Sequence, residues 1–294
     1  MYKIVKSECL ADKIYLMDVE APRIARACQP GEFVIVKMDE VGERIPLTMC
    51  DYDREKGLVT IVFQIVGAST ERMAGLKAGD SFADFVGPLG QPSEFVKDDL
   101  EEVKKRRYLF VAGGVGSAPV YPQVKWLKER GIDVDVVEGA KTKDMLILEE
   151  EMRSVAGNLY ITTDDGSYVR KGMVTDVVKD LVENQGKKYD VCVAIGPMIM
   201  MKFVCKLTKE LGIPTIVSMN PIMVDGTGMC GACRVSGEVK FACVDGPEFD
   251  GHLVDFDQAM KRQQMYKTEE GRAILRLREG ATHHGGCGNC GGEE

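Results

Sequence analysis

The sequence predicts an all-β N-terminal barrel, a doubly wound α/β domain with a parallel sheet, and a small C-terminal loop module. Three observations predict this class. Short apolar runs separated by turns fill residues 1–98, apolar runs alternating with helical patterns fill residues 99–221, and three cysteines gather in residues 222–250. Residues 251–294 carry no strand signal and form a C-terminal extension. A chain of 294 residues is long enough to give each domain its own core.

The first region contains the runs "KIYLMDV", "EFVIVKM" and "LVTIVFQIV", a pattern typical of an antiparallel barrel or sandwich. Three loops there carry residues that can bind a ligand: "RIPLT" (44–48), "VGAST" (66–70) and "GPLGQP" (87–92). An arginine can hold a phosphate through two parallel hydrogen bonds, and the serine and threonine hydroxyls add polar partners. Each loop alone is more typical of a turn, but together, ahead of a nucleotide-type domain, they indicate a binding surface.

The second region begins after a charged stretch at 97–107 and alternates strands with helices. The predicted strands are "YLFVA" (108–112), "DVDVV" (133–137), "LYITT" (159–163), "VCVAI" (191–195) and "PTIVS" (214–218). Helical spacing relates Val120, Val124 and Leu127, with Gly131 as the C-terminal cap, and relates Val174, Val177, Val178 and Leu181. Continuous apolar strands between amphipathic helices indicate a parallel sheet that binds ligands at the carboxyl ends of its strands.

A glycine-rich loop, "VAGGVGSAP" (111–119), follows the first of these strands. Glycines let backbone N–H groups approach a pyrophosphate at a helix N-terminus, where we expect Ser117 to cap the helix. A glycine-rich turn that binds nothing is the alternative. We expect the second strand to end at Glu138, whose carboxylate would accept a hydrogen bond from a ribose 2′-hydroxyl and repel a 2′-phosphate. This favours NAD(H) over NADP(H), although Lys141 and Lys143 weaken the preference.

The cysteine module has the spacing Asp225-x4-Cys230-x2-Cys233-x9-Cys243. With a cysteine in place of Asp225, this would be close to the plant-type [2Fe–2S] spacing. Asp225 is therefore the candidate fourth ligand, and as a harder ligand than a thiolate it would shift the redox potential. The glycines of "GTGMCG" (226–231) suit a loop wrapped round a cluster. A zinc site, or three cysteines beside a solvated aspartate, are the alternatives.

The remaining cysteines and the histidines receive no chemical role. Scattered cysteines are common small core residues, and this interpretation covers Cys9, Cys28, Cys50, Cys192 and Cys205. The C-terminal "HHGGCGNC" offers His283, His284, Cys287 and Cys290, which could bind a metal, but the flanking glycines favour a flexible tail. His252 is interpreted as structural or solvated.

Composition excludes several classes of protein. The chain has 46 acidic and 38 basic residues, a net charge of −8, which argues against nucleic-acid binding. Its start lacks the features of a signal peptide, and its longest apolar stretch is too short to span a membrane. We expect a cytoplasmic protein, in whose reducing compartment cysteines are metal ligands or core residues before they are disulfides. Neither a Ser-His-Asp arrangement nor a pair of catalytic carboxylates is apparent, so no catalytic acid–base residue is predicted.

The order of "RIPLT", "VGAST", "GGVGSAP", "EGAKTKDM", "TTDDGS" and "AIGPMIMM" resembles that of the ferredoxin–NADP reductase superfamily. The added [2Fe–2S] loop narrows the resemblance to the electron-transfer subunits of dihydroorotate dehydrogenase, which use four cysteines. Aspartate at the first ligand position resembles the small subunits of NADH-dependent reduced ferredoxin:NADP oxidoreductases, also known as sulfide dehydrogenase subunits. The resemblance covers residues 1–250 and leaves the extension, a candidate docking segment, unexplained.

The resemblance implies an oxidoreductase subunit with FAD in the barrel, NAD(H) on the α/β domain and a [2Fe–2S] cluster in the module. It implies a heterodimer with a larger FAD and iron–sulfur subunit, and electron bifurcation among NADH, NADPH and ferredoxin. The alternatives are a dihydroorotate dehydrogenase subunit and a non-catalytic module that binds a nucleotide and zinc. The implied flavin residues are Arg44, Pro46, Leu47, Thr48, Gly67, Ser69 and Thr70, and the implied NAD(H) residues are Gly113, Gly114, Gly116, Glu138, Asp164 and Gly196.

Overall fold

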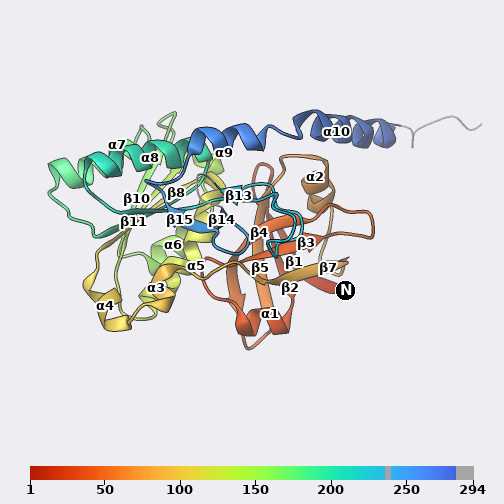
Figure 1. Ribbon diagram of the computed structural model, residues 1–294, viewed down its shortest axis with the longest axis horizontal. Coiled ribbons are helices and arrows are strands. Elements are labelled where there is room, and N and C mark those ends of the chain that lie inside the picture. The colour runs from red at the N-terminus through yellow and green to blue at the C-terminus, as the bar shows by residue number, and fades with distance from the viewer. Residues whose placement is uncertain (236–239, 283–294) are drawn as a thin grey trace, which may run out of the picture.

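The computed structural model describes residues 1–235 and 240–282. A β-barrel and an α/β domain lie side by side, and the C-terminal helices run along one edge of both (Figure 1). The fold class predicted from the sequence is confirmed: an antiparallel barrel precedes a doubly wound parallel sheet and a small loop module.

The barrel consists of antiparallel strands in the order β6-β1-β2-β5-β4-β3-β7. Apolar side chains on alternate positions of these strands fill its interior, as Val34 and Val36 of β3 do. Helix α1 begins with Pro22, which suits the first turn because proline lacks an N–H to donate. The elements are β1 (Tyr2–Ala11), β2 (Ile14–Glu20), α1 (Pro22–Ala27), β3 (Phe33–Lys37), β4 (Ile45–Asp53), β5 (Leu58–Gln64), α2 (Ala68–Ala74), β6 (Ser81–Phe82) and β7 (Asp84–Leu89).

The α/β domain contains a parallel sheet in the order β10-β9-β8-β11-β12. The chain leaves β8 in one direction and returns to β11 on its other side, which creates a switch point between these two strands. The elements are α3 (Glu94–Lys97), α4 (Leu100–Lys105), β8 (Tyr108–Gly113), α5 (Ser117–Lys128), β9 (Asp135–Ala140), α6 (Glu149–Val155), β10 (Asn158–Thr163), α7 (Val174–Lys179), β11 (Val191–Ile195), α8 (Met198–Glu210) and β12 (Thr215–Ser218). Short 3₁₀ turns span Gly114–Gly116 and Lys143–Met145, and a π-helix, Asp180–Asn184, extends α7.

The helical periods predicted from the sequence are confirmed. Val120, Val124 and Leu127 are buried on α5, and Gly131 after this helix has a φ of 76° and donates its N–H to Lys128. The predicted set on α7 and its π-helical extension is also buried: Val174, Val177, Val178 and Leu181. Each strand of the parallel sheet begins within two residues of the start of its predicted run. Strand β9 continues past its predicted end, to Ala140.

The C-terminal part adds to both domains. Two short strands, β13 (Arg234–Val235) and β14 (Lys240–Phe241), pair antiparallel in the cysteine module, and β15 (Glu248–Asp250) pairs antiparallel with β12. Helices α9 (Phe256–Gln263) and α10 (Lys267–Thr282) follow. Helix α10 reaches back along the molecule to α2 of the barrel (Figure 1).

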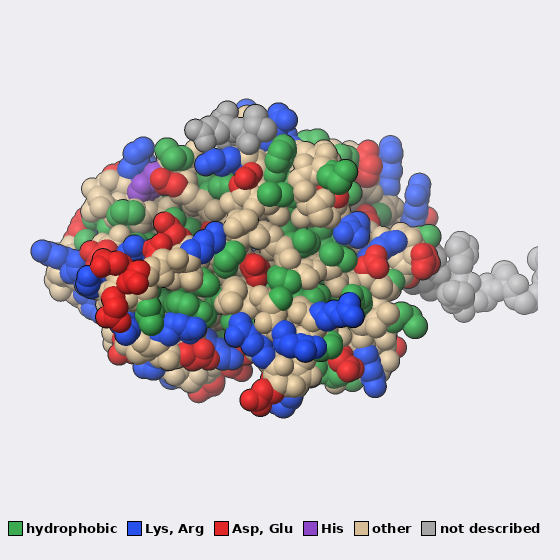
Figure 2. Space-filling model, turned by 60° about the horizontal axis from the view of Figure 1, so that its bottom comes forward, with side chains coloured by type: hydrophobic (Ala, Val, Ile, Leu, Met, Phe, Trp, Pro, Cys, Tyr) green, Lys and Arg blue, Asp and Glu red, His purple; other side chains and the backbone are tan. Residues whose placement is uncertain are grey.

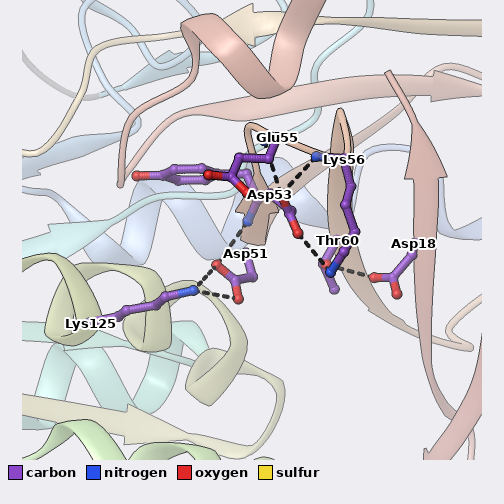
Figure 3. A network of polar contacts seen from close by, with 8 residues as sticks. Asp18, Asp51, Asp53, Glu55, Lys56, Thr60 and Lys125 are labelled. Carbon is purple, nitrogen blue, oxygen red and sulfur yellow. Dashed lines mark hydrogen bonds and ion pairs between the residues drawn. The ribbon is translucent and has the colours of Figure 1, made fainter. Parts of the chain in front are cut away.

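An apolar contact joins the barrel to the α/β domain. Ile14, Leu16 and Val62 on the outer barrel surface pack against Ala118 of α5. Beside this contact, Lys125 of α5 forms an ion pair with both carboxylate oxygens of Asp51 in β4, each at 2.8 Å (Figure 3).

Basic and acidic side chains are interspersed on the face drawn in Figure 2, in agreement with the mixed composition. Among the helices of the described part of the chain, none combines the length and the apolar character that crossing a bilayer requires.

Candidate functional site

Three glycines pack together at the carboxyl ends of β8 and β11, at the switch point of the parallel sheet. A Cβ added to Gly116 would lie 2.1 Å from the carbonyl oxygen of Ile195, and one added to Gly196 would lie 3.0 Å from Cα of Gly113. A Cβ on Gly113 would lie 2.3 Å from Sδ of Met200. The structure therefore brings together the glycines predicted to bind the dinucleotide, and their backbones touch where a side chain would not fit.

Gly114 differs from its neighbours because nothing lies within 4 Å of an added Cβ and its φ is 54°. The loop surface at Gly114 is open, directly before α5. Ser117 is wrongly predicted as the helix cap: its hydroxyl makes no capping bond and donates instead to Oε1 of Glu138 at 2.5 Å. The first turn of α5 therefore leaves its N–H groups uncapped by a side chain, a suitable partner for an anion.

Glu138 is not at the end of its strand, because β9 continues to Ala140. Its carboxylate is fully buried beneath α5, and Oε2 has no hydrogen-bond partner in the described structure. Burial raises the pKa of Glu138 to about 7, and the hydrogen bond from Ser117 partly opposes this rise. The expectation that Glu138 binds a ribose hydroxyl is therefore corrected: the carboxylate is inside the domain, where the sheet meets α5.

Asp164 does lie at the predicted edge, directly after β10, and its backbone N–H donates to the carbonyl of Ala140 at the end of β9. Lys141 and Lys143 follow β9 at the same edge and are exposed. Nζ of Lys143 lies 4.9 Å from the ring centre of Tyr168. Acidic and basic side chains thus both line this edge of the sheet.

The motif "RIPLT" divides between the two faces of the barrel wall. Strand register pairs Pro46 with Ile35 and Thr48 with Phe33, so these four side chains share the outer face. Leu47 points the other way and packs against the barrel core. The structure therefore places Pro46 and Thr48 on one surface and separates Leu47 from them.

Arg44 precedes β4 and contacts the cysteine module. Its Nε donates to the carbonyl of Val224 at 2.7 Å, and Nη2 donates to the carbonyl of Asp225 at 3.3 Å. Asp84 lies 3.8 Å from the same guanidinium. The predicted flavin-binding arginine thus connects the barrel to the loop that carries the candidate cluster ligands.

The motif "VGAST" forms the start of α2. The hydroxyl of Thr70 accepts hydrogen bonds from the N–H groups of Val66 and Gly67 and donates to the carbonyl of Gly67, so its bonding capacity is fully used within the turn. The hydroxyl of Ser69 donates to Glu43. Nothing lies within 4 Å of an added Cβ at Gly67. The Thr70 hydroxyl is therefore used inside the turn, and Gly67 leaves the surface beside it without a side chain.

The third loop, "GPLGQP", begins inside β7 and so is only partly a loop. Its Gln91 donates its backbone N–H to the carbonyl of Gly246 at 2.6 Å and its side-chain amide to the carbonyl of Val244 at 3.0 Å. A Cβ on Gly90 would lie 2.7 Å from the Gly246 oxygen. This loop holds the cysteine module against the barrel.

The four candidate metal ligands form two pairs. Sγ of Cys230 lies 3.2 Å from Oδ1 of Asp225, and Sγ of Cys233 lies 3.2 Å from Sγ of Cys243. In residues 1–235 and 240–282, no three ligand side chains surround a single metal position. Two pairs suit a cluster with two irons, each held by two protein ligands, better than one tetrahedral zinc.

Asp225 is oriented by its own loop. Its carboxylate accepts hydrogen bonds from the N–H groups of Thr227, Met229 and Cys230. Burial raises its pKa, but the hydrogen bonds from Cys230, Met229 and Thr227 more than offset this effect, so the pKa lies below its ordinary value. The carboxylate is therefore ionised, as a metal ligand must be.

The glycines of the cysteine loop adopt conformations that other residues avoid. Gly226, Gly228 and Gly231 have φ values of 80°, 86° and 68°. On the inner side of this loop, Cys233 and Cys243 pack with Phe33 and Ile35 from the outer face of β3. The residues present thus fit a small cluster held against the barrel wall.

One polar junction was not predicted from the sequence. Oε1 of Glu248 in β15 accepts hydrogen bonds from Ser93, at 2.9 Å, and from the buried amide of Gln123 in α5, at 2.8 Å. Burial raises the pKa of Glu248 to about 7. These hydrogen bonds connect the segment that follows the barrel, helix α5 and the end of the cysteine module. None of the three residues belongs to a sequence motif that would predict the contact.

The remaining cysteines largely follow expectation. Burial raises the pKa of the thiols of Cys28, Cys50, Cys192 and Cys205, which makes them poor nucleophiles. Cys9 differs, because it is exposed on β1. The ring of His252 lies 3.1 Å from the hydroxyl of Thr208, in agreement with a structural role. The tail residues lie outside the described residues: His283, His284, Cys287 and Cys290.

Comparisons with known proteins address both halves of this site. Residues 220–255 match the family model of the iron–sulfur cluster binding domain of dihydroorotate dehydrogenase B, and residues 110–206 match that of the oxidoreductase NAD-binding domain. These matches, with the solved structure of a flavin-based complex described below, confirm the predicted oxidoreductase and its NAD(H), iron–sulfur and FAD cofactors.

Two curated relatives and one solved structure cover nearly the whole chain. An uncharacterised protein of the adh 3′ region of Clostridium beijerinckii is 66% identical over all of both chains. A homologue of the dihydroorotate dehydrogenase B (NAD(+)) electron transfer subunit from Thermotoga maritima is 46% identical over 91% of this chain and 92% of its own. A chain of the NADH-dependent reduced ferredoxin-NADP oxidoreductase, described for flavin-based electron bifurcation, is 44% identical, with a TM-score of 0.86 over 95% of this chain and 98% of that one.

Proposed function

Because this chain belongs to the family of dihydroorotate dehydrogenase B electron-transfer subunits, we propose that it relays electrons between NAD(H) and a larger subunit in a bifurcating complex. It resembles the small subunit of an NADH-dependent reduced ferredoxin-NADP oxidoreductase, as aspartate at the first ligand position of the cysteine module predicted. In this proposal, residues 1–98 bind FAD, residues 99–221 bind NAD(H), residues 222–250 hold a [2Fe–2S] cluster, and residues 251–294 contact the partner.

The observation that carries the proposal is the shared outer face of β3 and β4. Pro46 and Thr48, two of the flavin-binding candidates, are cross-strand neighbours of Ile35 and Phe33. Those two side chains in turn pack with Cys233 and Cys243. A flavin against β4 and a cluster in the cysteine loop would therefore lie on adjoining parts of one barrel surface, as a direct electron relay requires.

The dinucleotide site in this proposal lies at the switch point. Gly113, Gly116 and Gly196 add no side chains of their own at this edge of the sheet, which supports the approach of a pyrophosphate to the N–H groups at the start of α5. Asp164 lies further along the same edge. The buried Glu138 does not support a preference for NAD(H), because its carboxylate has no access to a ribose. The preference is supported instead by the names of the relatives, which contain NAD(+) and NADH.

The cluster ligands are Asp225, Cys230, Cys233 and Cys243. A flavin bound at the barrel would supply hydride exchange with the nicotinamide, and a cluster held by these four residues would supply one-electron transfer to the partner. The protein positions these groups, and the oxygen ligand at Asp225 makes one iron differ from the other. The partner in this proposal is a larger FAD and iron–sulfur subunit, and the complex exchanges electrons among NADH, NADPH and ferredoxin.

A second candidate is the electron-transfer subunit of a dihydroorotate dehydrogenase. Several curated relatives favour it, including one from Geobacillus thermodenitrificans that is 35% identical over 84% of this chain. The same relay would then carry electrons from dihydroorotate oxidation to NAD. Purification of the chain with its native partner separates the two candidates, because only the second complex reduces NAD with dihydroorotate.

An anaerobic absorption spectrum of the purified chain, with iron and flavin assays, tests the relay. We expect one flavin and about two irons per chain, and bleaching of both sets of bands after NADH is added. A colourless protein that contains zinc and does not respond to NADH would refute the proposal.

A further inference from the structure

Two arginines far apart in the sequence bind the backbone of the loop that carries the candidate cluster ligands, here called the cluster loop (residues 224–233). Arg44, before β4, donates to the carbonyls of Val224 and Asp225 at 2.7 and 3.3 Å. Arg262, in α9, donates from Nη2 to the carbonyl of Ala232 at 2.9 Å. The loop is thus held by the barrel at its beginning and by the C-terminal extension at its end.

The contacted carbonyls belong to the ligands or their neighbours. Asp225 is the candidate oxygen ligand, and Ala232 directly precedes Cys233. Each ligand pair therefore has one guanidinium bonded to the backbone beside it. A guanidinium has fixed, planar donors and keeps its charge at all pH values of interest, so it can both orient a loop and place a positive charge there.

The charge of the cluster gives these contacts a redox consequence. Three thiolates and one carboxylate make the site anionic, and reduction adds another negative charge. A nearby positive charge stabilises the reduced state more than the oxidised state. Asp84 forms an ion pair with the Arg44 guanidinium at 3.8 Å. At this separation, on a partly exposed surface, the carboxylate offsets the positive charge of Arg44 only weakly.

We propose that Arg44 and Arg262 are positioning residues that fix the cluster loop and raise the reduction potential of its cluster. The inference rests on the proposed function, since it requires the cluster. It also assigns Arg44 a role at the cluster loop that differs from the phosphate contact expected of it, and it gives α9 a part in redox tuning.

The test is an anaerobic redox titration of the full-length protein, followed by EPR and absorption, in four variants: Arg44→Gln, Arg44→Lys, Arg262→Gln and Arg262→Lys. For each glutamine variant we expect the equilibrium constant for one-electron reduction to fall about tenfold, which corresponds to ~59 mV. The lysine variants keep the positive charge but lose the planar guanidinium with its fixed donors. We therefore expect a smaller fall in this equilibrium constant, together with a broadened EPR signal.

Arg130→Gln is the matched control, because Arg130 also donates to one backbone carbonyl, that of Trp126 at 3.0 Å, but at the end of α5. Its potential should equal that of the wild type. Iron and flavin contents are measured in every variant. If a glutamine variant loses iron while keeping flavin, the positioning role is supported. If it fails to fold, the lysine variant decides.

Unchanged potentials and EPR signals in variants that retain iron would overturn the inference. For Arg44, loss of flavin with an unchanged cluster potential would do the same, because the arginine would then act on the flavin alone. These outcomes differ from failure of the proposed function, which would appear as a wild-type protein without iron or without a response to NADH.

Discussion

At Gly116, in the loop before α5, an added Cβ would meet other backbone, whereas the glycines of the loop from Gly226 to Gly231 adopt positive φ values beside side chains. A Cβ at Gly116 would lie 2.1 Å from a carbonyl oxygen, and no rotamer change could relieve that contact. A Cβ at Gly226 would lie 2.5 Å from Cδ1 of Ile35, a side chain that can move. Both loops are rich in glycine, but Gly116 is required by backbone packing, whereas Gly226, Gly228 and Gly231 are required by their backbone conformation.

The largest effect is expected from Gly116→Ala. Because the new methyl group meets backbone, we expect the free energy of unfolding to fall by about 3 kcal/mol. Urea denaturation measures this loss. Gly114→Ala is the matched control, because its Cβ meets nothing within 4 Å and only its φ of 54° is strained, at a cost of about 1 kcal/mol. Equal losses in the two variants would show that packing does not distinguish these glycines.

Gly226→Ala should cost about 2 kcal/mol, from a φ of 80° combined with crowding against Ile35. We also expect a lower iron content, because this residue directly follows Asp225. Adding Ile35→Val removes the crowding methyl group and should recover part of the stability, which a double-mutant cycle measures. Absence of any recovery would mean that the contact with Ile35 does not contribute to the loss, which would then come from backbone strain and from Leu89, whose Cδ1 lies 3.0 Å from the added Cβ.

Glu138→Gln tests how tightly the first loop region is packed. Burial raises the pKa of Glu138 from 4.5 to about 7, so the folded chain binds this proton more tightly than the unfolded chain. The resulting stabilisation is complete below pH 4.5 and is lost as the pH rises through about 7. Between pH 5 and pH 8 we expect wild-type stability to fall by about 2 kcal/mol more than that of the variant.

Denaturation curves at several pH values check this difference. Glu248 has its pKa raised in the same direction, but it is present in both proteins and cancels in the comparison. Parallel stability curves for the wild type and Glu138→Gln would contradict the buried, protonated state of this carboxyl group.

The smallest effect is expected from Gly231→Ala. Its φ is 68°, but the nearest atom to an added Cβ, on Phe241, lies at an ordinary contact distance of 3.6 Å. We expect a loss of about 1 kcal/mol in unfolding free energy, with the iron content unchanged. A loss as large as that of Gly226→Ala would show that the second loop is as tightly packed as the first.

The sequence predicted the helices and strands that are specified by the spacing of apolar residues within one short segment. The β11 strand and the buried faces of α5 and α7 followed from apolar spacing, and the order of motifs led to the correct family. The end of β9 was misplaced because Glu138 reads as a polar stop. In the structure it is a buried strand residue whose pKa is raised by burial and whose carboxylate accepts a hydrogen bond from Ser117.

Contacts between distant segments could not be predicted. Arg44 was recognised by its motif, but its partners lie about 180 residues away in the chain. Glu248 and Gln123 meet at a junction that exists only after the domains pack. Thr70 was expected to offer its hydroxyl to a phosphate, and only the folded turn reveals that the hydroxyl is already used. These interactions depend on tertiary geometry, for which spacing along the chain carries no signal.

Strand β3 is buried on both faces, with Val34 and Val36 inside the barrel and Phe33 and Ile35 beneath the cysteine module. A barrel produced without the module would expose an aromatic and a branched aliphatic side chain on a single strand. Such a surface invites self-association. The barrel therefore depends on the module for its solubility, and the chain could not be shortened at residue 221 without exposing this surface.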